Sequence, residues 1–212
     1  TANNRAVFFV GTGNQEVVNT GGSALIEIPY VIINKGNPSD EIRLNANMEI
    51  ANSLQIDQGT LVTNNGLTVN SGASFTNSGT ITGTFTFQRE LTGSAGYRLL
   101  SVPFSSITYD SFLDPIWTQG QSDSEANGGD TNEGDSNGFT WDKTSTDDAN
   151  TNWSGVTDLS GTINAGNGFL VYVYEDDNYS DPDGIVWPKT LSVTGNENSV
   201  DTSPDLNTNV DG

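Results

Sequence analysis

Two residue types with special chemistry are missing, because the 212 residues include no cysteine and no histidine. The lack of cysteine excludes disulfides and thiolate metal sites. The lack of histidine excludes Ser/His/Asp and Cys/His catalysis, and zinc sites built on histidine with them. A hydrolase that works with two carboxylates stays open, but no carboxylate pair stands out in the sequence. We therefore expect a protein that is not an enzyme.

Basic residues are also scarce, with 7 Lys and Arg against 27 Asp and Glu and a net charge of -20. Such a charge repels nucleic-acid phosphates, so we expect no nucleic-acid partner. No apolar run approaches the roughly 18 residues of a membrane span, so we expect no membrane insertion. Acidic chains rich in Asn, Thr and Gly without Cys are common among exported bacterial proteins, and we expect an extracellular location.

Short β-strand patterns fill the first part of the chain. Residues 6–10 form an apolar run of β-forming residues, and residues 23–34 alternate apolar and polar side chains up to a turn at Pro38. Residues 41–87 repeat, because LQIDQGTLVTNNG (54–66) aligns with LTVNSGASFTNSG (67–79) at an interval of thirteen. Short strands with glycine turns at a fixed interval predict a β-solenoid or, as the alternative, a β-meander.

The pattern changes after Arg89, where GSAG (93–96) leads into a new apolar segment. Strand patterns at 138–142, 168–174 and 185–193 are separated by acidic loops, and we expect a helical turn within 109–117. The last two strands are predicted to pair as a hairpin. The whole chain is therefore predicted to be all-β, with solenoid-like or meander repeats at 1–92 and a β-sandwich-like region with long acidic loops at 93–212.

Two acidic runs, at residues 130–135 and 176–184, predict calcium binding. In both runs oxygen-bearing side chains recur beside a glycine that permits a sharp reversal, as in loops that wrap a hard cation. Neither run is an EF-hand, and a solvated acidic turn is the alternative. The predicted ligands are Asp130, Asn132, Asp135, Asp176, Asp177, Asp181 and Asp183.

Four tryptophans stand in or beside the polar second half of the chain. Sugar-binding sites combine exposed aromatic rings with a few polar groups such as Asn and Asp. Trp141 and Trp153 are the residues that we predict for a glycan site. The alternative is that these rings fill the core, as Trp and Tyr do in many β domains.

Four phrases carry a resemblance to a known class of proteins: GYRLLSVP (96–103), DPIWTQG (114–120), GFTWD (138–142) and AGNGFLVYVY (165–174). This part of the chain resembles a segment of large surface proteins that Bacteroidota export by the type IX pathway. In that family the segment follows β-solenoid-like Thr/Asn/Gly repeats, as it does here. The resemblance implies an adhesive or scaffold protein outside the cell and no catalytic residues. The sorting domain of the family is missing, so we expect a fragment or a trimmed mature form.

Together these features predict an extracellular structural or adhesive protein that self-associates into a filament or surface layer stabilised by calcium. Solenoid ends expose unpaired backbone groups and invite end-to-end stacking. Alternatively, the strand at residues 6–10 is donated to a neighbouring sheet or closes the sheet of its own chain. A carbohydrate-binding or adhesion module of a larger secreted protein is the second hypothesis.

Overall fold

The computed structural model describes residues 5–21, 25–121, 135–142, 152–176 and 187–198. Its contacts divide the chain into two units. The first unit comprises Thr1–Glu90 and Ser192–Glu197, and the second comprises Leu91–Leu191 and Asn198–Gly212. Among the described residues, no helix is long and apolar enough to cross a bilayer.

The first unit is a β-solenoid of about four turns, formed by residues 6–87 and built from two sheets, A and B. The order in sheet A is β1 (Ala6–Gly11), β3 (Leu25–Lys35), β5 (Asn47–Gln58), β7 (Leu67–Val69), β10 (Phe85–Leu91) and β17 (Lys189–Gly195), and β8 (Ser74–Asn77) also pairs with β5. The order in sheet B is β2 (Gln15–Val17), β4 (Glu41–Leu44), β6 (Thr60–Val62) and β9 (Thr80–Thr82).

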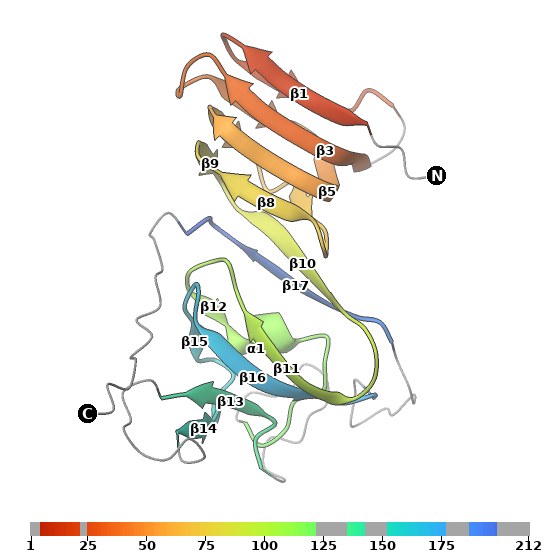
Figure 1. The fold of residues 1–212 in the computed structure, drawn as a ribbon, viewed down its shortest axis with the longest axis vertical. Coiled ribbons are helices and arrows are strands. Elements are labelled where there is room, and N and C mark those ends of the chain that lie inside the picture. The colour runs from red at the N-terminus through yellow and green to blue at the C-terminus, as the bar shows by residue number, and fades with distance from the viewer. Residues whose placement is uncertain (1–4, 22–24, 122–134, 143–151, 177–186, 199–212) are drawn as a thin grey trace, which may run out of the picture. The chain divides into compact units, whose positions relative to one another are not determined.

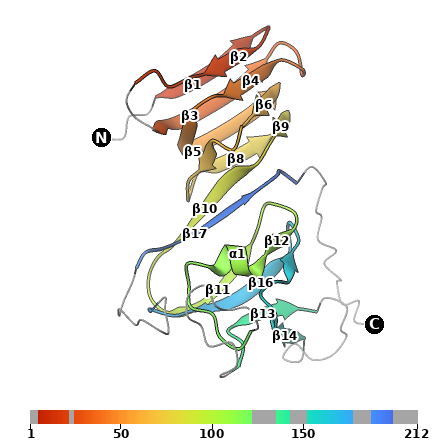
Figure 2. The same cartoon turned by 180° about the vertical axis from the view of Figure 1, so that it is seen from behind.

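The strands of successive turns pair in parallel in both sheets. Figure 1 shows β1, β3, β5 and β8 stacked in this way, and Figure 2 shows β2, β4, β6 and β9 from the other side. Parallel pairing between turns is the signature of a solenoid, whereas a meander pairs consecutive strands in antiparallel fashion. The solenoid prediction and the all-β fold class are therefore confirmed.

The solenoid core forms from alternate side chains of each strand. Val31 of β3 is in register with Leu54 of β5, and Ile33 with Ile56, and all four side chains are fully buried. Side chains alternate between the two faces of a strand, so every second residue points inwards. The apolar alternation in the sequence therefore marks the inner face of the solenoid.

One turn of the solenoid is longer than the thirteen-residue interval in the sequence. Hydrogen bonds between neighbouring turns, such as the one from Asn64 Nδ2 to Leu44 O at 2.9 Å, join residues 19 to 21 apart. The two similar segments are also not equivalent in space. Val62 lies in β6 of sheet B, whereas the aligned Phe75 lies in β8 of sheet A. The interval therefore marks successive units of strand and turn.

The second unit contains the antiparallel sheet C, in the order β11 (Gly96–Ser101), β16 (Gly168–Val173), β13 (Gly138–Trp141) and β14 (Trp153–Gly155), and a short pair formed by β12 (Ile107–Thr108) and β15 (Thr162–Ile163). The expected helical turn is present as α1 (Tyr109–Leu113), which Thr108 caps by accepting a hydrogen bond from Ser111 N at 3.2 Å. Phe169 of β16 packs edge-on against Tyr109 and Phe112. One face of sheet C is therefore buried with α1.

The expected hairpin between residues 168–174 and 185–193 is wrong. β16 pairs with β11 on one side and with β13 on the other, so neither edge is left for the next strand. β17 lies beside β10 in sheet A instead. There Thr194 Oγ1 lies 2.8 Å from Thr86 Oγ1, and Glu197 accepts hydrogen bonds from Asn77 Nδ2 at 2.6 and 2.7 Å.

Candidate functional site

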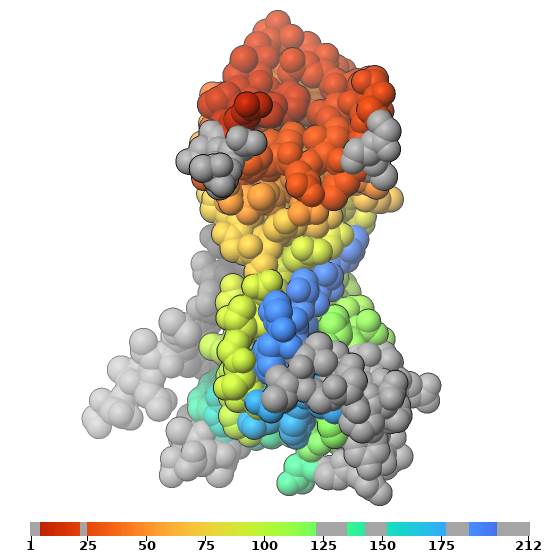
Figure 3. Space-filling view, turned by 90° about the vertical axis from the view of Figure 1, so that its right-hand side faces the viewer, coloured from red at the N-terminus to blue at the C-terminus, as the bar shows by residue number. Residues whose placement is uncertain are grey.

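At the N-terminal end of the solenoid, the described part of the chain places an edge strand in each of the two sheets. Among the described residues, β1 pairs only with β3, and β2 pairs only with β4. Figure 3 shows this end in red, as the last layer of the stack. An edge strand presents unpaired N–H and C=O groups that can pair with another strand. We call the surface formed by β1 and β2 the open end.

Apolar side chains are exposed at the open end. Phe8 and Val10, on the outer face of β1, are 60% and 55% exposed. Val7 and Phe9 point inwards and lie in register with core residues of β3, yet they are only partly buried. In the part of the chain that the structure describes, no further strand covers the inward-pointing side chains of β1, although terminal repeats of solenoids normally carry a polar outer face.

A buried lysine holds the open end in place. Lys35, the last residue of β3, is 1% exposed. Its Nζ donates hydrogen bonds to Val10 O of β1 at 3.2 Å and to Gln15 Oε1 of β2 at 2.9 Å. β1 itself carries no charged side chain, despite the net charge of -20. β1 is therefore an uncharged edge strand anchored to the turn below it, whereas β2 carries the exposed Glu16.

Sheet C has one face that is rich in exposed aromatic side chains. The strand register places Tyr97 opposite Tyr172 and Trp141 opposite Trp153, and directly opposite residues share a face. The surface, which we call the aromatic face, comprises Tyr97, Leu99, Phe139, Trp141, Trp153, Leu170 and Tyr172. Four of these side chains are exposed, namely Tyr97, Leu99, Trp141 and Trp153.

The rings of the aromatic face pack edge to face. The ring centroids of Trp141 and Trp153 are 5.0 Å apart at an interplanar angle of 69°, and those of Tyr97 and Tyr172 are 5.1 Å apart at 84°. Burial raises the pKa of the adjacent Tyr174, and electrostatic interaction with the neighbouring phenols of Tyr172 and Tyr97 raises it further. The contacts hold the rings in defined positions, because edge-to-face pairs are favourable.

An asparagine just before β13 connects β16 to residues 117–121. Asn137 is buried, and its Nδ2 donates hydrogen bonds to Trp117 O at 3.0 Å and to Tyr172 O at 2.9 Å. Its Oδ1 accepts hydrogen bonds from Gln119 N and Gln121 Nε2, both at 3.1 Å. The full hydrogen-bonding capacity of the amide is used. This side chain therefore helps to position the strand that carries Tyr172.

The structure brings together two of the residues predicted from the sequence, Trp141 and Trp153, as a cross-strand pair. Asp135 and Asp176 are described, and the carbonyl of Asp135 accepts a hydrogen bond from Gln119 Nε2 at 3.2 Å. The other predicted calcium ligands lie outside the described residues: Asp130, Asn132, Asp177, Asp181 and Asp183. Within the described part of the chain, no three acidic side chains are grouped to hold a metal ion. Calcium binding stays a prediction.

Sequence reasoning missed Tyr97, Leu99 and Tyr172 as members of a surface. A signal was present, because β11 and β16 carry large apolar side chains on both faces, as in GFLVYV (168–173). Such a strand is expected to be buried on both sides. In this structure the second face of β11 stays exposed at Tyr97 and Leu99.

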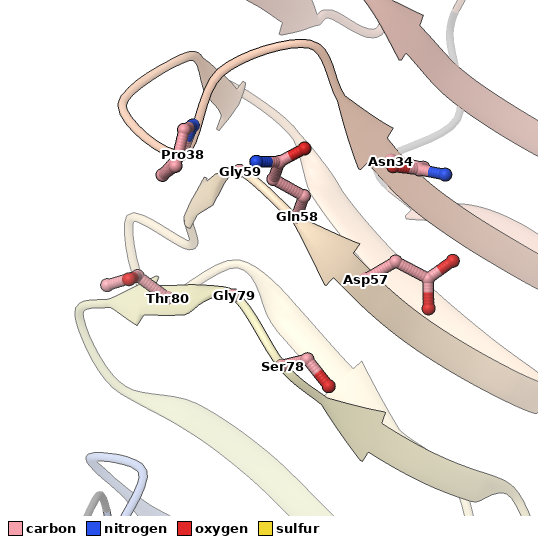
Figure 4. A pocket seen from close by; sticks show the side chains of 8 residues that line it. All are labelled: Asn34, Pro38, Asp57, Gln58, Gly59, Ser78, Gly79 and Thr80. Atoms are coloured by element: carbon pink, nitrogen blue, oxygen red, sulfur yellow. The ribbon is translucent and has the colours of Figure 1, made fainter.

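A groove of about 340 Å³ lies along stacked turns of the solenoid (Figure 4). It is lined by Asn34, Pro38, Asp57, Gln58, Gly59, Ser78, Gly79 and Thr80. Asp57 is the one charged residue in this lining, and its Oδ1 accepts a hydrogen bond from Gln55 Nε2 at 2.8 Å. The groove therefore lacks the converging charged groups of a catalytic site.

No known protein family, curated protein or solved structure gives a significant match to the chain. The resemblance to exported surface proteins stays a prediction from four sequence phrases. The open end and the aromatic face are therefore interpreted from the physical properties of their own residues.

Proposed function

We propose that the chain is an extracellular, non-enzymatic structural protein that self-associates through the open end. One observation carries this proposal: β1 and β2 are edge strands, and the apolar side chains Phe8 and Val10 are exposed on the first of them. A further layer of strands would pair the free backbone groups and remove this apolar surface from water. Each fully buried side chain of this size is worth about 1.5–3 kcal/mol.

Composition and resemblance support the extracellular and non-enzymatic parts of the proposal. The absence of His and Cys removes the commonest general base and the thiol nucleophile. The phrases at 96–103 and 165–174 resemble segments of exported surface proteins. A scaffold or adhesive role outside the cell is consistent with both.

The sequence of β1 is self-complementary in an antiparallel arrangement. If two copies pair about Phe8, that residue faces its own counterpart, and Val7 of one copy faces Phe9 of the other. Opposite residues of an antiparallel pair lie on the same face, so the inward-pointing side chains would join the two cores. No charges would oppose each other, because Ala6–Gly11 contains none. A head-to-head pair with twofold symmetry is therefore the smallest assembly that we propose.

Sedimentation velocity over a dilution series tests the head-to-head pair. We expect the wild type to form a reversible dimer and Phe8→Glu to stay monomeric, because two carboxylates would meet at the twofold axis. Thr76→Glu is the matched control, since Thr76 is an exposed residue on the same outer ladder but within β8. It should dimerise like the wild type. A wild type that is monomeric at every concentration, or two variants that behave alike, would overturn the proposal.

A head-to-head pair is closed, so growth into a filament or surface layer requires a second contact. We propose that the acidic runs at residues 130–135 and 176–184 supply this contact by binding calcium. Negative-stain electron microscopy with calcium, and then with excess chelator, tests the step. Filaments that disappear on chelation would support it. Dispersed particles in both conditions would contradict calcium-linked growth without affecting the dimer.

A further inference from the structure

The two faces of sheet C differ in chemical character. The buried side chains of one face are the aliphatic Leu100, Val171 and Val173 together with the ring of Phe169. The aromatic face carries Tyr and Trp in the same four strands. Aliphatic side chains suit burial against another protein layer, whereas Tyr and Trp join an apolar ring to an O–H or N–H donor that suits a wet surface. The aromatic face therefore fits a partner that is both apolar and rich in hydroxyl groups.

The aromatic face is also uncharged. None of its side chains is acidic or basic, although the chain has a net charge of -20. A field of this sign repels anionic ligands such as sulfated or uronic-acid glycans. The preferred ligand is therefore an uncharged one.

The rings form a row that crosses all four strands. The row runs from Tyr97 on β11 through Tyr172 and Phe139 to Trp153 on β14. Neighbouring strands lie about 4.8 Å apart, so the row extends about 14 Å across the strands, and the register also carries it diagonally along them, from Tyr172 towards the Gly168 end of β16. This length suits several consecutive units of a polymer better than one small molecule. Because the rings already pack against one another, binding would immobilise few additional rotamers.

We propose that the aromatic face binds an extended, uncharged polysaccharide. The C–H face of successive sugar rings would stack on Tyr97, Tyr172 and the pair Trp141–Trp153, and the sugar hydroxyls would bond to phenol, indole N–H and water. The inference does not rest on self-association, because the aromatic face belongs to the second unit and the open end to the first. The proposal assigns an adhesive activity to the aromatic face, separate from the open end.

Native gels cast with a mixed-linkage β-glucan, a xyloglucan or a galactomannan test this assignment, with alginate as the anionic comparison. We expect at least one neutral polysaccharide to retard the wild type, and Tyr97→Ala and Trp141→Ala to weaken binding by about tenfold or more. Trp141→Phe keeps a ring and should retain part of the affinity. Val18→Ala is the matched control, because it removes exposed apolar surface outside both the aromatic face and the strands of the open end.

Circular dichroism checks that each variant is folded, and Phe8→Glu separates the two proposals, because a monomeric variant should still be retarded. Equal retardation of the wild type and folded Trp141→Ala would overturn the inference. Retardation by alginate alone, or by none of the polysaccharides, would overturn it too and would favour a protein partner for the aromatic face.

Discussion

Replacing Asn137 with alanine should strongly destabilise the second unit. The amide makes four hydrogen bonds, to Trp117 O, Tyr172 O, Gln119 N and Gln121 Nε2. The side chain is 3% exposed, so water cannot replace the lost partners without opening the structure. At about 1 kcal/mol for each bond, and with incomplete additivity, the expected loss is about 3–4 kcal/mol. A domain with the usual stability of about 5–15 kcal/mol would lose a large share of it.

Urea unfolding followed by tryptophan fluorescence measures this loss specifically, because residues 117, 141, 153 and 187 are the four tryptophans and all belong to the second unit. Asn137→Asp is a second variant that preserves shape but loses the donors. The introduced carboxyl would face two carbonyl oxygens, so its pKa should rise above the value of about 3.9 in the unfolded chain. The free energy of unfolding of Asn137→Asp should therefore fall further below that of the wild type as the pH rises through the folded-state pKa of this carboxyl group. A loss below about 1 kcal/mol for Asn137→Ala, with an unchanged denaturant slope, would refute the reasoning.

Three further predictions concern the solenoid and the tyrosines. Lys35→Met removes the two hydrogen bonds that the lysine Nζ donates to the open end, so amide exchange in β1 should accelerate and stability should fall by about 1–3 kcal/mol. The control is Arg43→Met at an exposed side chain, with an expected effect below about 1 kcal/mol. Gly79→Ala would bring a Cβ to 2.5 Å from a backbone carbonyl oxygen, so thermal unfolding should show a loss of stability of about 1–3 kcal/mol. The control is Gly168→Ala, whose Cβ would meet only ordinary van der Waals contacts and whose stability should be nearly unchanged. Burial raises the pKa of Tyr174 in the folded protein. The neutral phenol should therefore contribute fully to the free energy of unfolding below about pH 10, and this contribution should be lost as the pH rises through the higher pKa of the folded state. Urea unfolding at alkaline pH can measure the loss.

The strands of the solenoid could be predicted from the sequence, because each strand must bury every second side chain. The length of a turn could not, because it depends on where the chain crosses from sheet A to sheet B. Different residues make these corners: Gly59 adopts a positive φ at one, and Asn64 and Asn65 do so at another. A local repeat reveals units of strand and turn, but it does not show which sheet each strand joins.

The two candidate sites, the open end and the aromatic face, could be predicted from the sequence to different degrees, because the first depends on a local run of residues and the second on strand pairing. Residues 6–10 are an apolar run in the sequence, and they form the edge strand β1. Trp141 and Trp153 could be selected by residue type, but their pairing could not, because residues 143–151 contain no two-residue turn signal that sets the register. Tyr97 gains its role from β16, which is distant in the sequence. Contacts of this kind arise from the fold as a whole.

The distribution of charge determines how two copies can meet. At a net charge of -20 the copies repel each other, and salt shortens the range of that repulsion to about 8 Å at physiological ionic strength. Contact through β1, the uncharged strand of the open end, should therefore strengthen as monovalent salt increases, because the repulsion is screened while the burial of Phe8 and Val10 is unaffected. Contact through calcium bound between acidic loops should weaken under the same change, because salt screens the attraction between calcium and carboxylate. The direction of the salt dependence thus distinguishes the two routes of assembly in the wild-type protein.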